Sequence, residues 1–272
     1  MTWKIKKMKF GFIGAGNMGG ALCKAVSKST KEILIADFFA EKAEKLAEIT
    51  GGKAADNKTI AENCDYIFLG VKPQMMAEML GGIKDSLNNN KDVVLVTMAA
   101  GLKISTIQEM AGGEYKVIRI MPNTPVEVGE GEILYTKGDK VTDSELETFL
   151  TNMKFAGKLN AIPESLMDAG CSVSGCGPAF VYMFIRSLAE GGMECGIDEE
   201  TALQMAAQTV IGSAKLLMES GENPADLIEK VCSPGGSTIE GVKSLDNDNL
   251  ADVVVNAVKA AYKRNVELGK AE

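Results

Sequence analysis

The first predicted helix is preceded by a glycine-rich loop, Gly14-Ala15-Gly16-Asn17-Met18-Gly19. This loop follows an apolar segment, residues 9–13, that predicts a strand, and it opens a predicted helix over residues 19–27. In such a unit the first glycine allows a tight turn, the second lets the backbone approach a pyrophosphate, and the third lets helix and strand pack closely. The helix amino terminus then faces the phosphates. The pattern favours dinucleotide binding, although glycine-rich turns also occur without ligands.

Strands and helices alternate over the first 162 residues. The predicted strands are residues 9–13, 33–36, 66–69, 93–98, 116–120, 132–135 and 158–162, and the predicted helices are 19–27, 41–47, 73–83, 104–110 and 143–154. Strands that are apolar throughout are typical of a parallel sheet covered on both faces. The class expected for residues 1–162 is therefore α/β, with a doubly wound parallel sheet.

The pattern changes near Pro163, after which no convincing strand is found. Predicted helices span residues 179–193, 201–220, 225–231, 238–245 and 250–268, so residues 163–272 form a second, all-helical domain. The helix over 201–220 is small and apolar over most of its circumference. Such a helix is expected to be buried, either centrally or in a subunit interface.

The chain contains no histidine among its 272 residues, which excludes Ser-His-Asp and Cys-His catalysis and any histidine-ligated zinc; no metal site is predicted. The net charge of −8 argues against a nucleic-acid partner. The longest nearly unbroken apolar run, residues 93–102, is shorter than the roughly 20 residues of a spanning helix. The basic start, residues 1–9, is not followed by an apolar stretch of signal-peptide type. We expect a cytoplasmic protein without a membrane partner.

The six cysteines form no C-x-x-C pair. Most stand beside apolar or small residues at helix-like spacing. We interpret them as buried, reduced thiols rather than metal ligands or redox groups.

Asp37 follows the second predicted strand, 18 residues beyond Gly19. A carboxylate at this place accepts hydrogen bonds from the ribose hydroxyls of the adenosine and repels a ribose phosphate. Residues 37–40 also contain no Arg or Lys. These observations favour NADH over NADPH, unless Asp37 is only a solvated loop carboxylate.

Four later segments have the composition of loops at strand ends or helix starts: Val71-Lys72-Pro73, Ala99-Ala100-Gly101, Met121-Pro122-Asn123-Thr124-Pro125 and Ser233-Pro234-Gly235-Gly236-Ser237-Thr238. The last precedes an amphipathic helix. Its two glycines and the helix start expose backbone N–H groups, and its hydroxyls add donors, so it predicts an anion socket. The alternative is an ordinary capped helix start.

Together these segments resemble the pyrroline-5-carboxylate reductase family over essentially the whole chain. The resemblance rests on five motifs: residues 12–18, 71–73, 121–125, 174–179 and 231–238. It implies a Rossmann-like first domain and a helical domain that binds substrate and interlocks two subunits into a homodimer, often assembled further into a decamer. The implied reaction is the NAD(P)H-dependent reduction of the cyclic imine 1-pyrroline-5-carboxylate to L-proline.

The resemblance also assigns site residues. The implied cofactor contacts are Ile13, Gly14, Ala15, Gly16, Asn17, Met18, Gly19, Asp37, Asn57, Val71, Lys72, Pro73, Ala99, Ala100, Gly101 and Asn123. The implied substrate contacts are Ser233, Gly235, Gly236, Ser237, Thr238 and Glu164. Where many members carry small hydroxyl residues, this chain has Asp37-Phe38-Phe39, which puts efficient use of NADPH in doubt.

A protonated imine is already activated toward hydride attack, so the reaction requires no strong enzymatic acid and is compatible with a chain without histidine. The expected catalytic residues are Thr238, whose hydroxyl contacts the ring nitrogen, and Lys72, which helps position the cofactor. Each has a simpler alternative: a capped helix start and a surface charge.

Three other functions are weighed against this one. A β-hydroxyacid dehydrogenase requires a catalytic lysine near a glycine-rich turn of the helical domain, and residues 170–178 contain no lysine. A non-catalytic nucleotide-binding protein is distinguished only by an assay. A reductase of six-membered cyclic imines stays open, because one methylene is worth only ~1–3 kcal/mol of discrimination.

Overall fold

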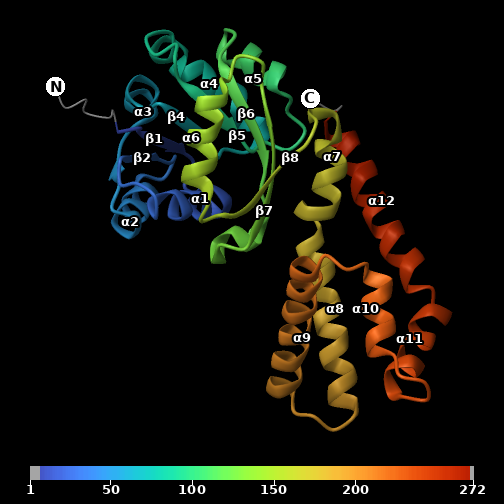
Figure 1. The fold of residues 1–272 in the computed structure, drawn as a ribbon. Coiled ribbons are helices and arrows are strands. Elements are labelled where there is room, and N and C mark those ends of the chain that lie inside the picture. Colours follow the sequence, from blue (N-terminus) through green and yellow to red (C-terminus); the bar gives the residue numbers. More distant parts are fainter. Residues whose placement is uncertain (1–6, 270–272) are drawn as a thin grey trace. The chain divides into compact units, whose positions relative to one another are not determined.

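The computed structural model describes residues 7–269, and its first part is built on one eight-stranded sheet (Figure 1). The strands lie in the order β3-β2-β1-β4-β5-β6-β7-β8. Their bounds are β1 Phe10–Ile13, β2 Ile33–Ala36, β3 Lys53–Ala54, β4 Tyr66–Leu69, β5 Val94–Thr97, β6 Lys116–Met121, β7 Gly131–Lys137 and β8 Gly157–Ala161. The two-residue strand β3 was not predicted, because it is too short to show an apolar pattern.

Helices cover both faces of this sheet, which explains why its strands carry no polar face. Phe10 and Phe12 of β1 pack in one core with α1 (Asn17–Ser27), α2 (Ala40–Thr50) and α6 (Asp143–Met153). Ile13 packs in a second core with α3 (Asn57–Asn63), α4 (Pro73–Asn88) and α5 (Ile104–Ala111). Successive side chains of a strand point to opposite faces, so β1, β2, β4, β5 and β6 each contribute to both cores. The predicted doubly wound architecture is confirmed, with α3 as an additional helix.

The sheet departs from the expected parallel arrangement at one pairing. β7 runs antiparallel to β6, whereas the other six pairings are parallel. Only a 3-10 turn, Thr124–Val128, connects β6 to β7. A parallel crossover needs a dozen or more residues, so a connection this short returns the chain antiparallel.

The rest of the described chain is helical: α7 Met167–Gly170, a π-helix Cys171–Gly175, α8 Gly177–Glu194, α9 Glu199–Ser220, α10 Pro224–Val231, α11 Ser237–Asn247 and α12 Leu250–Leu268. No helix within residues 7–269 has the length and apolar character needed to span a membrane. Asp198 Oδ1 accepts a hydrogen bond from the Thr201 amide and caps α9.

The chain divides into two compact units. One contains the residues up to Gly175 together with those from Tyr262 onward, and the other is Cys176–Ala261. The strands end at Ala161, directly before the predicted division after residue 162. Met167 is buried against Met121 and Leu134, so the segment after β8 packs on the sheet unit. The Asn265 side chain also donates to the Asp168 carbonyl at 3.2 Å. These long-range contacts leave no pattern in the local sequence.

α9 is far less buried within the chain than its composition suggested. Only Ala202 and Ala206 are buried, both in a small cluster with α8. Apolar side chains of both helices are exposed: Val181, Tyr182, Met183, Phe184, Leu188, Leu203, Met205, Ile211, Leu216 and Met218. Central burial within one chain is therefore wrong for this helix, and the interface alternative stays open.

The cysteines divide between core and surface. None of the six forms a disulfide, but only Cys23 and Cys64 are buried, and Cys195 is exposed. Burial raises the pKa of each buried thiol to about 12, which makes both unreactive at neutral pH. The expectation of buried thiols is wrong for Cys195, which is exposed as the C-cap residue after the last residue of α8.

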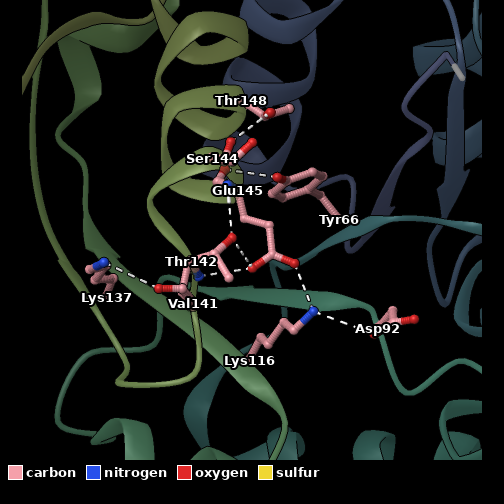
Figure 2. Close-up of polar contacts among 9 residues, drawn as sticks. All are labelled: Tyr66, Asp92, Lys116, Lys137, Val141, Thr142, Ser144, Glu145 and Thr148. Carbon is pink, nitrogen blue, oxygen red and sulfur yellow. Dashed lines mark hydrogen bonds and ion pairs between the residues drawn. The ribbon is translucent and has the colours of Figure 1, made fainter. Parts of the chain in front are cut away.

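The amino ends of the strands are closed by a side-chain network that holds α6 (Figure 2). Thr142 and Glu145 form a capping box at the start of this helix. Lys116 of β6 binds the Glu145 carboxylate at 2.7 Å, and the Tyr66 hydroxyl of β4 donates to the Glu145 carbonyl at 2.8 Å. Burial opposes ionisation of Glu145, but the hydrogen bonds from Lys116 and Thr142 outweigh it and hold the carboxyl pKa below its ordinary value.

Candidate functional site

The three glycines of the loop after β1 meet three different surroundings. Gly14 has a φ of +106°, and a Cβ on it would lie 2.6 Å from the Gly70 carbonyl oxygen. A Cβ on Gly19 would lie 2.2 Å from the Gly14 carbonyl oxygen. By contrast, a Cβ on Gly16 would meet nothing within 4 Å. The first and third glycines are thus required by packing within the chain, and the second leaves open space for a ligand.

The loop lies where the order of the sheet reverses. β2 and β3 lie on one side of β1, and β4 to β8 on the other, so the switch point falls between β1 and β4. The Gly70 amide after β4 donates to the Ile13 carbonyl at 2.7 Å and holds the two strand ends together. In open α/β sheets, ligands bind at the carboxyl ends of strands at such a point.

A cleft of about 900 Å³ opens at these strand ends, and we call it the strand-end cleft. Of the predicted cofactor contacts, it brings together Ile13, Gly14, Gly16, Asp37, Asn57, Val71 and Lys72. Sequence reasoning missed the lining residues Phe38, Lys42 and Lys58. Phe38 is 86% exposed at this cleft, and an apolar ring exposed beside a cavity offers a planar ligand a stacking surface.

A second cleft, of about 510 Å³, lies between α1 and α2, and we call it the helix-pair cleft. It contains the remaining central loop residues Ala15, Asn17 and Met18, and three lysines, Lys24, Lys42 and Lys45. No side chain caps the first turn of α1 and no acidic residue stands there. Its backbone N–H groups are therefore available to an anion, as the loop pattern predicted.

Asp37 makes two hydrogen bonds to backbone amides. Its Oδ2 accepts from the Ala15 amide at 2.7 Å, and its Oδ1 accepts from the Phe39 amide at 3.0 Å. The carboxylate therefore ties the end of β2 to the glycine loop. A carboxylate has about four lone-pair sites, so both oxygens retain acceptor capacity for a ribose hydroxyl.

Six predicted cofactor contacts line neither cleft: Gly19, Pro73, Ala99, Ala100, Gly101 and Asn123. Pro73 begins α4 at its first turn, as expected. Gly101 has a φ of +81°, and a Cβ on it would lie 3.2 Å from the Gly269 Cα. The Asn123 side chain donates to the Ser174 carbonyl at 3.0 Å and accepts from the Glu132 amide at 2.9 Å. Packing within the chain accounts for Gly101 and hydrogen bonding for Asn123. The cofactor role of all six residues stays a prediction.

Glu164 contacts a buried arginine that sequence reasoning missed. Its Oε1 accepts from the Ile104 amide at 2.7 Å and pairs with Arg119 Nη1 at 3.3 Å. The Arg119 side chain is 3% exposed, and its Nη2 lies 3.8 Å from the Asp168 carboxylate. Among residues 7–269, Arg119 Nε is the one buried side-chain nitrogen or oxygen without a partner. Glu164 thus fixes the start of α5 and compensates a buried charge; a contact with substrate stays a prediction.

The predicted anion socket lies in the second compact unit, between α10 and α11. Gly235 has a φ of +70°, a backbone conformation that favours glycine, and the Gly236 amide donates to the Ser233 carbonyl at 3.0 Å. Gly236 is the N-cap of α11, so no side chain caps the first turn, where Ser237 and Thr238 stand. The hydroxyls of Ser233, Ser237 and Thr238 are exposed in the single chain. This geometry leaves amides and hydroxyls available to an anion.

The sheet order, the open space at Gly16 and the cleft at the switch point define the first unit as a Rossmann-type dinucleotide-binding unit, followed here by an all-helical unit. Two family models match: one for pyrroline-5-carboxylate reductase dimerisation over residues 164–268, and one for coenzyme F420-dependent NADP oxidoreductases over residues 9–101. Together they cover the helical part and the first strands of the sheet.

Relatives of known name match along the whole chain. The pyrroline-5-carboxylate reductase of Methanosarcina acetivorans is 35% identical over 271 residues, which is 98% of this chain and 100% of that protein. The Escherichia coli enzyme is 35% identical over 267 residues, which is 96% of this chain and 98% of that protein. A solved structure of Plasmodium falciparum pyrroline carboxylate reductase with NADP bound superposes with a TM-score of 0.84 at 31% identity. The match covers 97% of this chain and 98% of that chain. This chain belongs to the pyrroline-5-carboxylate reductase family.

Proposed function

We propose that this chain reduces 1-pyrroline-5-carboxylate to L-proline with a nicotinamide dinucleotide, the final step of proline biosynthesis. The full-length similarity to named pyrroline-5-carboxylate reductases carries this proposal. The open position at Gly16 supports it, because the second glycine of such a loop lets the backbone approach a pyrophosphate and no atom of the chain fills the space beside it.

The residues of the two clefts fit a dinucleotide. The first-turn amides of α1 hold the pyrophosphate, and Asp37 accepts hydrogen bonds from the ribose hydroxyls. Asn57, Val71 and Lys72 line the strand-end cleft together with Asp37. The bound cofactor supplies the hydride. Lys72 stands at the amino end of α4, exposed and at the cleft, and helps to orient the cofactor. The preference for NADH that Asp37 predicts is part of this proposal.

The socket at Ser233–Thr238 holds the substrate. Backbone amides of Gly235, Ser237 and Thr238 bind the carboxylate, and the Ser233 hydroxyl adds a donor. The protonated imine N–H donates to the Thr238 hydroxyl oxygen, and this hydroxyl exchanges a proton with water. The imine carbon gains the hydride and the C=N double bond becomes a single bond, so no enzymatic acid is consumed. Holding two reactants in place in this way supplies on the order of 7–11 kcal/mol at best.

The helical part brings two copies together. The dimerisation model covers residues 164–268, and the exposed apolar side chains of α8 and α9 offer the surface that such a contact buries. We propose a homodimer through this part, which assembles further into a decamer, in the cytoplasm. Sedimentation at several concentrations measures the number of subunits.

The first experiment compares rates of NADH and NADPH oxidation with 1-pyrroline-5-carboxylate on one sample. Turnover with NADH preferred supports both the reaction and the role of Asp37. Turnover with NADPH preferred keeps the reaction and removes the preference. If neither cofactor turns over, the reaction is wrong, and six-membered cyclic imines and 3-hydroxy acids are the next substrates.

Thr238→Ala tests the socket. We expect its turnover to fall by more than roughly tenfold, a loss of about 1.4 kcal/mol, with little change in NADH affinity. Thr238→Ser is the matched control, because it keeps the hydroxyl. Unchanged turnover in Thr238→Ala removes this residue from the mechanism.

A further inference from the structure

Lys42 lies where the two clefts meet. Among residues 7–269, only Gly16 and Lys42 belong to the lining of both the strand-end cleft and the helix-pair cleft. The lysine stands in the first turn of α2, directly after the segment that carries Asp37. Lys42 therefore lines the space beside the open glycine and the carboxylate that is proposed to bind ribose.

The ammonium group of Lys42 has no carboxylate partner within residues 7–269. Its Nζ lies 4.8 Å from the centre of the ring of Phe39, which also lines the strand-end cleft, and the two form a cation–π contact. By contrast, Lys24 of the helix-pair cleft is paired with Glu127. Lys42 thus offers an uncompensated charge to a ligand.

Asp37 is less of an obstacle to an anion than its position in the sequence suggests. Two backbone N–H groups donate to its carboxylate, which spreads the negative charge over the loop. The strand-end cleft carries three acidic and three basic side chains: Asp37, Asp56 and Glu78 against Lys42, Lys58 and Lys72. Asp56 is occupied in capping α3 through the Thr59 amide at 2.8 Å. The cleft is therefore not acidic as a whole.

We propose that Lys42 binds the 2′-phosphate of NADPH and so sets how strongly this chain discriminates between NADPH and NADH. The inference rests on the proposed dinucleotide site and adds a specificity-determining residue to it. A phosphate monoester at the adenosine ribose is negatively charged and attracts the lysine ammonium group. The ribose hydroxyl of NADH is neutral and gains no such ion pair. Asp37 favours the hydroxyl and Lys42 favours the phosphate, so the two residues together determine the ratio of affinities.

Binding titrations of the full chain test this inference without catalysis. NADPH and NADH are titrated through their own fluorescence, and 2′,5′-ADP and 5′-AMP are titrated by displacement of NADH. Lys42→Gln removes the charge at an exposed helix position and keeps a good helix former. Lys45→Gln is the matched control, because Lys45 is also exposed on α2 but lines only the helix-pair cleft.

We expect Lys42→Gln to raise the dissociation constants of NADPH and 2′,5′-ADP by roughly tenfold or more. The dissociation constants of NADH and 5′-AMP should rise by less than about twofold. Lys45→Gln leaves the ratio of the two affinities within about twofold. Equal effects of Lys42→Gln on both members of each pair overturn the inference, and so does an unchanged NADPH affinity. If the native chain binds neither dinucleotide, the proposed site itself fails; if it binds both and the ratio does not move, only the role of Lys42 fails.

Discussion

The two ends of the parallel strands differ in the chemical groups that surround them. At the carboxyl ends of β1 and β4, glycines and backbone amides surround open clefts, and few side chains bind one another. At the amino ends, Tyr66, Lys116 and Glu145 bind one another and hold α6 on the sheet (Figure 2). One end leaves polar groups available to a ligand, and the other uses them within the chain.

This contrast separates binding from stability. A backbone amide that points into a cleft contributes nothing to folding until a ligand arrives, whereas a satisfied and partly buried network stabilises the fold at all times. Substitutions at the two ends are therefore expected to give different results. The following variants test that separation. The first, Gly14→Ala, is expected to lower both stability and cofactor binding.

Gly14→Ala should have the largest effect, because this glycine belongs to the packing of both strands. A methyl group at a φ of +106°, 2.6 Å from the Gly70 carbonyl oxygen, forces β1 and β4 apart. We expect the free energy of unfolding to fall by about 2–4 kcal/mol, and cofactor binding to be lost with it. Urea denaturation measures the first quantity. Native stability in this variant would mean that the close approach of these strands is not needed.

Gly16→Ala should separate binding from stability cleanly. A methyl group on Gly16 meets no atom within 4 Å, and the φ of −69° suits alanine. The free energy of unfolding should stay within about 0.5 kcal/mol of the native value, as for substitutions away from packed features. The dissociation constant for NADH should rise by roughly tenfold or more, because the methyl group occupies the path of the pyrophosphate. Fluorescence titration decides, and unchanged affinity would place the pyrophosphate elsewhere.

Local patterns in the sequence were sufficient for most of the fold. The strand–loop–helix unit at Gly14–Gly19, the apolar strands and the Thr142 cap act over a few residues, so periodicity and composition reveal them. The reversal of β7 and the packing of Met167 on the sheet depend on loop length and on residues far apart in the chain. No local pattern encodes those contacts.

The candidate site was predictable where backbone geometry requires one residue type. The glycine loop and Asp37 stand at fixed spacings, and the structure brings them to one cleft with Asn57 and Lys72. Lys42 and Arg119 were missed, because a lysine in an amphipathic helix usually faces solvent and an arginine in a strand gives no sign of its partners. Only the folded chain places Arg119 beside Glu164 and Lys42 beside Gly16.

Glu145→Gln tests the closed end of the sheet. The amide preserves the shape of the capping box but removes the charge that binds Lys116, so the free energy of unfolding at neutral pH should fall by about 1–2 kcal/mol. The lowered carboxyl pKa means that this stabilisation is present above the ordinary value of 4.5 and is lost as pH falls through the folded-state pKa. The difference between native and variant should therefore shrink in acid. An equal difference at all pH values would contradict the ion pair, and NADH affinity should not change.

Tyr66→Phe should have the smallest effect and gives the sharpest comparison with Gly16→Ala. Burial raises the pKa of Tyr66 to about 12, so its hydroxyl remains a donor to the Glu145 carbonyl at neutral pH. Phenylalanine keeps the stacking on Phe10, whose ring centre lies 5.1 Å away, and loses only the hydrogen bond. We expect a loss of about 1 kcal/mol in urea denaturation. Tyr135→Phe is the control, because the Tyr135 hydroxyl makes no hydrogen bond within residues 7–269. A fall in NADH affinity in Tyr66→Phe would show that the two ends of the sheet are coupled, because this substitution changes nothing at the clefts.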